Sequence, residues 1–156
     1  MIYLTLNDFE VITQELKHFF QKNKEPLPVF SESYFDKLDS VIASPRRTFG
    51  GKDLYQSLFA KAACYFYFIN KLHPFSNANK RISIVSTGVF FMYNDYEFTA
   101  SEDMMYGFAK RVTLSKKDQT TEFEEVIAFI TKNSRRQTTF IGPRIIMNLL
   151  RFFQKR

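Results

Sequence analysis

A run of nine residues, HPFSNANKR, places an imidazole, two amides, a lysine and an arginine between His73 and Arg81. It follows the strongly apolar stretch AACYFYFI almost directly. A loop that ends one buried helix and opens another leaves backbone N–H groups unpaired at the start of the second helix. These groups and the helix dipole favour an anion. Asn77, Ala78 and Asn79 have short side chains that let the backbone approach a phosphate, so the run predicts a polyphosphate site.

The charged members of the run fit the same chemistry. Lys80 and Arg81 add positive charge and a two-pronged donor in the first turn of the second helix. His73 is placed to take a proton from an attacking hydroxyl. Pro74 stiffens the loop, and Phe75 anchors it in the core. Taken singly, such residues are more often structural or solvated, and the ordered set within nine residues is what favours function.

The surrounding elements are predicted to be helices. Apolar residues at helical spacing and end signals predict six helices before residue 133. The third is apolar almost all round over residues 57–72, which is typical of a helix buried on most sides. Short extended pieces are expected in RRTFG and YEFTA. The predicted helix starts are Thr5 with Asp8, Ser33, Asp53, Asn79, Ser101, and a capping box of Thr121 with Glu124.

Composition bounds the fold class. The chain has 156 residues, of which 45% are hydrophobic, which favours one domain with a substantial core, and the predicted helices make that domain all-α. The single cysteine, Cys64, excludes an intrachain disulfide and a multi-cysteine metal site, and a buried thiol is expected. His18 is expected on a helix surface. No signal peptide and no membrane span are recognised, so a cytoplasmic protein is expected.

The net charge of +6 lies entirely in residues 134–156, which hold six basic and no acidic residues. Pro26 and Pro28 are expected to end the first helix, residues 133–139 to form a polar linker, and Pro143 to open a last helix. This basic amphipathic helix either packs back on the bundle, contacts a dimer partner or another protein, or binds a membrane surface. Nucleic-acid binding through the cationic tail is a weaker alternative.

HPFSNANKR resembles the signature of the Fic/Doc (Fido) family. In order, the nine positions of that signature are His; Pro or another residue; Phe; a variable residue; an acidic residue; Gly or Ala; Asn; Lys or Gly; and Arg. Upstream, FGGKDLYQSLFAKAACYFYFINKLHPF is similar to the family's flap and leading helix. The resemblance implies a Fic/Doc-like helical bundle with a central buried helix and a short flap. It places a Fic/Doc domain at 1–133 and a C-terminal helical extension at 134–156.

The resemblance also implies a chemistry. Family members transfer part of a nucleotide to a hydroxyl of a target protein, here from ATP or another NTP with Mg²⁺. His73 would deprotonate the hydroxyl, while Asn79 and Arg81 hold phosphates. The whole nucleotide-binding set is Ser76, Asn77, Ala78, Asn79, Lys80 and Arg81. The flap that aligns the target is Arg47, Thr48, Phe49, Gly50, Gly51 and Lys52.

The residues around Asn79 resemble the Doc branch. Doc toxins carry Lys at the position of Lys80, often after Ala, phosphorylate their target and are neutralised by a separate antitoxin. A translation factor is one candidate target. AMP-transferring members usually carry Gly in place of Lys80, and AMP transfer is the first alternative.

Asn77 departs from the signature, since it replaces the acidic residue that helps hold Mg²⁺. A neutral amide is a weaker Mg²⁺ ligand than a carboxylate. The lost attraction is about 4 kcal/mol for unit charges ~4 Å apart at an effective dielectric constant of about 20. Either the nucleotide mainly holds the metal, or another acid substitutes, or activity is impaired. The second alternative is therefore a degenerate Fic-fold nucleotide-binding module.

Overall fold

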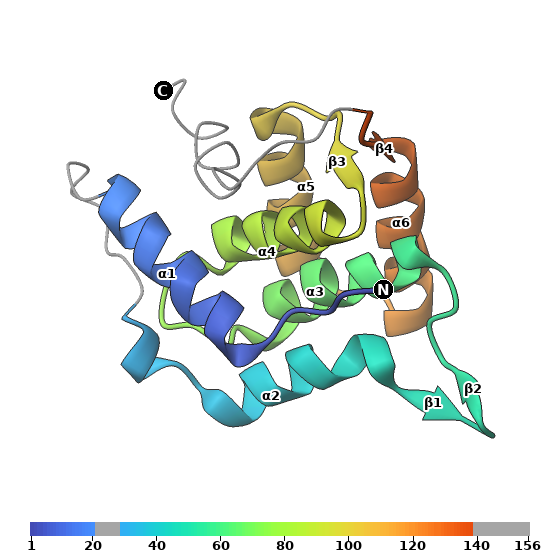
Figure 1. Cartoon of the computed structure of the whole chain (residues 1–156), viewed down its shortest axis with the longest axis horizontal. Coiled ribbons are helices and arrows are strands. Elements are labelled where there is room, and N and C mark those ends of the chain that lie inside the picture. Colours follow the sequence, from blue (N-terminus) through green and yellow to red (C-terminus); the bar gives the residue numbers. More distant parts are fainter. Residues whose placement is uncertain (21–28, 139–156) are drawn as a thin grey trace.

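The computed structural model describes residues 1–20 and 29–138. Over these residues the chain is a helical bundle with two small two-stranded sheets, which confirms the predicted all-α fold (Figure 1). The helices are α1 Leu6–Phe20, α2 Phe35–Ala43, α3 Leu58–Leu72, α4 Asn79–Tyr93, α5 Glu102–Leu114 and α6 Gln119–Lys132. Two short 3-10 turns, η1 Phe30–Glu32 and η2 Ser44–Arg46, flank α2. The strands are β1 Thr48–Phe49, β2 Lys52–Asp53, β3 Tyr96–Phe98 and β4 Ser134–Arg136.

Helix α3 is the centre of the bundle, as the sequence predicts. It contacts α2, α4, α5 and α6 (Figure 1). Every residue from Ala60 to Asn70 is buried. Cys64 is fully buried, as expected. Because its apolar side chains cover nearly the whole circumference, α3 is stable only when other helices enclose it.

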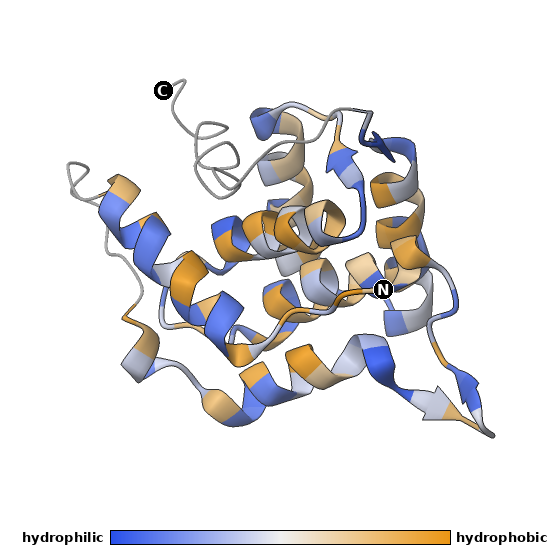
Figure 2. Cartoon of the chain, in the orientation of Figure 1, coloured by the Kyte–Doolittle hydropathy of each residue, from blue (hydrophilic) through white to orange (hydrophobic). Residues whose placement is uncertain are grey.

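Helix α1 covers the bundle with one apolar face. Hydrophilic and hydrophobic stretches alternate along it in Figure 2, and Phe9, Ile12 and Leu16 are among its buried residues. The predicted cap is present. The backbone N–H of Thr5 donates to Asp8 Oδ2 over 2.7 Å, and the backbone N–H of Asp8 lies 3.3 Å from Thr5 Oγ1. His18 is exposed, as expected.

Two predicted helix starts are wrong. Helix α3 begins at Leu58 with Ser57 as its cap, not at Asp53. Gly50 and Gly51 both have positive φ and close a two-residue turn, so Asp53 is drawn into β2 opposite Thr48. Helix α6 begins at Gln119, because the Asp118 carboxylate caps it by accepting from the backbone N–H of Thr121.

The other boundaries are close to those predicted. Helices α4 and α5 begin at Asn79 and after Ser101, and the expected extended pieces are β1 and β3. Helix α2 begins at Phe35, two residues after Ser33, because Ser33 closes η1.

The predicted polar linker 133–139 contains a strand instead. Strand β4 pairs antiparallel with β3, with Glu97 opposite Arg135, and the Arg135 Nε lies 2.7 Å from Glu97 Oε1. The residues of β4 show no alternation of apolar and polar side chains. The strand is therefore not predictable from local sequence, because it forms by pairing with β3, which is distant in the chain. The predictions for Pro26, Pro28, Pro143 and the last helix lie outside the described residues. Among the helices that are described, none has the length and apolar character needed to cross a membrane.

Candidate functional site

The loop between α3 and α4 begins and ends with a strained residue. His73 caps the C-terminus of α3 with φ 48°, and Ala78 precedes α4 with φ 60°. Both lie in the left-handed region, which side-chain-bearing residues seldom adopt. Such conformations persist only where the surrounding structure holds them, and they cluster at functional sites.

Contacts of the backbone and of one aromatic ring fix this loop. Phe75 is 1% exposed, and its ring centroid lies 6.2 Å from that of Phe9. The carbonyl of Pro74 accepts from the backbone N–H of Tyr34 over 2.8 Å. The start of α2 is therefore bonded directly to the loop, although the two are about 40 residues apart in sequence.

The amide of Asn79 closes the loop on itself. Its Oδ1 accepts from the backbone N–H of Phe75 over 3.1 Å, and its Nδ2 donates to the Phe75 carbonyl over 2.8 Å. The side chain predicted to hold phosphate is thus engaged in shaping the loop. The four-residue spacing between these two positions was a local signal that sequence analysis left unused.

The first turn of α4 presents a cationic helix start. The carbonyl of Ala78 accepts the first helical hydrogen bond, from Ile82, and Ala78 has no side-chain oxygen with which to cap the turn. Its leading N–H groups and the helix dipole therefore favour an anion. Lys80 and Arg81 are half-buried there. The guanidinium carbon of Arg81 lies 4.7 Å from the Phe20 ring centroid and 5.9 Å from that of Tyr106.

His73 lies beside this turn in a state suited to a base. Partial desolvation, followed by the charges of Lys80 and Lys37, lowers the pKa of His73, and a hydrogen bond to the Asn70 main chain opposes the shift. A lowered pKa favours the neutral form of the ring near pH 7. A neutral imidazole has one ring nitrogen without a proton, and that nitrogen can accept one.

Lys37 is the site residue that sequence analysis missed. It lies in α2, and its ammonium is 4.7 Å from the Tyr34 ring centroid. The hydrogen bond between Tyr34 and Pro74 brings the start of α2 to the loop, and with it the charge of Lys37. No local pattern could have indicated this, since the proximity depends on a long-range contact.

The described residues do not form a carboxylate site for Mg²⁺. Ser76 and Asn77 are exposed on the loop. No group of three or more His, Cys, Asp or Glu side chains is arranged to hold a metal in the part of the chain that the structure describes. The loop 73–81 contains no carboxylate, and the side-chain oxygen at the signature's acidic position is the neutral amide of Asn77, which is a weaker Mg²⁺ ligand.

The predicted flap forms a hairpin but does not lie beside His73. Residues 48–53 form β1, β2 and their turn, and this hairpin adjoins the N-terminal end of α3, whereas His73 follows its C-terminal end (Figure 1). The 15 residues of α3 separate the two sites by about 22 Å of helix rise. A pocket of about 530 Å³ lies near the hairpin, between residues 54–60 and α6. The structure therefore brings residues 73–81 together and leaves 47–52 apart from them.

These features define a class of protein: a helical bundle with a cationic helix start next to a histidine of lowered pKa. A sequence model of the Fic/DOC family matches residues 3–91, more than half of the chain, and the chain belongs to this family. The matched region runs from the N-terminal segment into α4 and contains the whole 73–81 loop. No curated protein and no solved structure matches the chain significantly. Family membership supports NTP-dependent transfer of the Fic type as the class of function.

Proposed function

We propose that this chain is a Doc-like toxin that transfers the γ-phosphoryl group of ATP, or of another NTP, to a hydroxyl of a target protein. A separate antitoxin would neutralise it, and a translation factor is one candidate target. The proposal rests on membership of the Fic/DOC family and on the combination of Ala78 and Lys80 around Asn79.

The chemistry assigns a role to each part of the loop. The free ring nitrogen of His73 accepts the proton of the target hydroxyl. The hydroxyl oxygen then bonds to the γ-phosphorus, the bond from that phosphorus to the β–γ bridging oxygen breaks, and the nucleoside diphosphate leaves with the bond's electron pair. The first-turn N–H groups of α4, with Lys80 and Lys37, stabilise the negative charge on the phosphates.

One observation carries the proposal. The imidazole of His73 lies between α3 and the first turn of α4, and its pKa is lowered first by desolvation and then by the charges of Lys80 and Lys37. Charges that would attract phosphate therefore also favour the unprotonated form of the base.

The second candidate function is nucleotide binding without transfer. It is favoured by the exposed, neutral Asn77 in place of an acid. AMP transfer differs from phosphorylation only in which phosphorus is attacked, and the loop geometry favours neither.

Labelled ATP separates these functions. The full chain is incubated with Mg²⁺, cell lysate and ATP labelled at either the γ- or the α-phosphate. Label on protein from the γ position supports phosphorylation, and label from the α position supports AMP transfer and overturns our proposal. ATP binding without any label supports the binding module.

The control for this assay is a pair of histidine variants. His73→Ala should abolish labelling, whereas His18→Ala, which alters an exposed residue of α1, should leave it unchanged. If both variants lose labelling equally, or if neither variant loses it, His73 does not have the proposed role in the mechanism.

Partner binding through residues 134–156 is a separate proposal. We expect a truncation after residue 137 to change the oligomeric state or the solubility if this segment contacts a partner or packs on the bundle. A truncated chain that stays monomeric, soluble and equally stable would contradict both roles.

A further inference from the structure

A buried amide lies three residues before His73. Asn70 is 1% exposed and belongs to the last turn of α3. Its Nδ2 donates to the Phe66 carbonyl and to Ser83 Oγ, each over 2.8 Å, and its Oδ1 accepts from Thr113 Oγ1 over 3.2 Å. Both donor hydrogens are therefore used, and the amide links α3 to α4 and α5 in a fixed orientation.

Two connections extend from Asn70 to the proposed site. His73 caps the same last turn of α3, three residues after Asn70, and its backbone N–H donates to the Ile69 carbonyl over 3.1 Å. On the other side, Ser83 accepts from Asn70 and donates to the carbonyl of Lys80 over 2.7 Å. The hydrogen bonds of Asn70 and Ser83 therefore tie the turn that ends at the proposed base to the first turn of α4.

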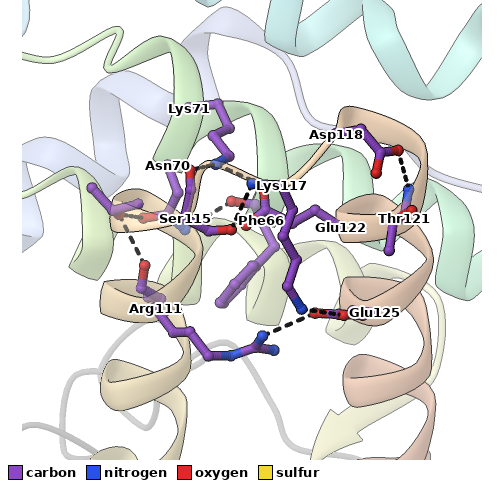
Figure 3. A network of polar contacts seen from close by, with 12 residues as sticks. Phe66, Asn70, Lys71, Arg111, Ser115, Lys117, Asp118, Thr121, Glu122 and Glu125 are labelled. Carbon is purple, nitrogen blue, oxygen red and sulfur yellow. Dashed lines mark hydrogen bonds and ion pairs between the residues drawn. The ribbon is translucent and has the colours of Figure 1, made fainter.

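The last turn of α3 is also anchored from α6. Lys71 Nζ lies 2.6 Å from Glu122 Oε2 and 2.9 Å from the Ser115 carbonyl (Figure 3). Asn70 and Lys71 thus hold adjacent positions of one turn to different helices. Of these two residues, only Asn70 is connected, through Ser83, to the residues that would bind phosphate.

We propose that Asn70 and Ser83 are positioning residues, which fix His73 relative to the phosphate-binding turn at Asn79–Arg81. The inference rests on the proposed function, since it concerns the alignment of that base with that turn. Its physical basis is that misplacing reacting groups by about 1 Å can cost roughly 100-fold in rate.

A merely structural role makes a different prediction, and α4 offers a matched control. Ser83 and Ser86 are both fully buried hydroxyls of the same helix, and both donate to a main-chain carbonyl. Only Ser83 contacts Asn70. If buried hydroxyls matter solely for packing, Ser83→Ala and Ser86→Ala should have similar effects.

The test compares the full-length wild type with these two variants. The His73 Cε1–H resonance is titrated with pH by NMR, and label transfer from ATP is measured at varied ATP concentration. We expect Ser83→Ala to raise the pKa of His73 toward its ordinary value, because the last turn of α3 is no longer tied to the turn of α4 that carries Lys80. Turnover should fall about tenfold or more, with the KM for ATP within about twofold. Ser86→Ala should change neither the titration nor turnover by more than about twofold. If Ser83→Ala does not fold, the test uses Ser83→Cys instead, because the thiol fills a similar space and is only a weak hydrogen-bonding group.

The outcomes separate this inference from the proposed function. Identical titration and turnover in the Ser83 and Ser86 variants would overturn the positioning role and leave the transferase proposal standing. A wild type that transfers no label, combined with a His73 titration that differs only in the Ser83 variant, would overturn the transferase proposal and support the positioning role.

Discussion

The buried ion pair between α3 and α6 gives the sharpest prediction of stability. The Glu122 side chain is 2% exposed and that of Lys71 is 22% exposed, and the two lie 2.6 Å apart. Tyr67 lies close by, and burial followed by the charge of Glu122 raises the pKa of Tyr67 to about 12. Removing the lysine leaves a carboxylate in the core without its cationic partner.

We therefore expect Lys71→Met to destabilise the fold by about 3 kcal/mol. Breaking a buried pair costs about 3–5 kcal/mol, and the partial exposure of Lys71 favours the lower end. For a chain of this length, each kcal/mol corresponds to about 2–4 °C, so the thermal midpoint should fall by roughly 6–12 °C. The assay is urea and thermal unfolding followed by circular dichroism.

The double variant Lys71→Met/Glu122→Leu is the control. Replacing a buried pair by apolar residues is often neutral or stabilising, so the double variant should recover most of the loss. Lys117→Met removes a partner of Glu125 at the surface and should leave the midpoint almost unchanged. A cost below about 1 kcal/mol for Lys71→Met, or no recovery in the double variant, would refute the assigned role of the pair.

Three further predictions concern the loop. The rate of transfer should rise with pH as His73 loses its proton, with a midpoint below the ordinary value of 6.5. Lys80→Gln should move that midpoint upward, since the protonated ring then meets less repulsion; an unmoved midpoint would exclude the lysine as a cause. Asn77→Asp should increase Mg²⁺-dependent transfer by supplying a carboxylate, and an active wild type unaffected by the change would contradict the interpretation of Asn77 as the metal position. Ala78→Gly should stabilise the fold by about 0.5–1 kcal/mol in urea unfolding, because Gly adopts φ 60° without steric cost; a loss of stability would show that the left-handed conformation is not strained.

The sequence alone determined the helices and the position of the loop. Apolar spacing and capping residues act within one or two turns, so Thr5, Ser101 and the buried face of α3 could be recognised without any tertiary contact. The ordered types from His73 to Arg81 likewise indicated phosphate chemistry, and the Fic/DOC family match covers this loop.

Tertiary structure decided what surrounds the loop. The charge of Lys37 acts on His73 because Tyr34 bonds to Pro74, and Asn70 joins three helices through Ser83 and Thr113. Asp53 joins a strand instead of capping α3, and β4 forms only because β3 lies beside it. Except for the local hairpin that holds Asp53, these outcomes depend on residues far apart in the chain, whose contacts form only when the helices pack around α3. Local periodicity carries no information about such contacts.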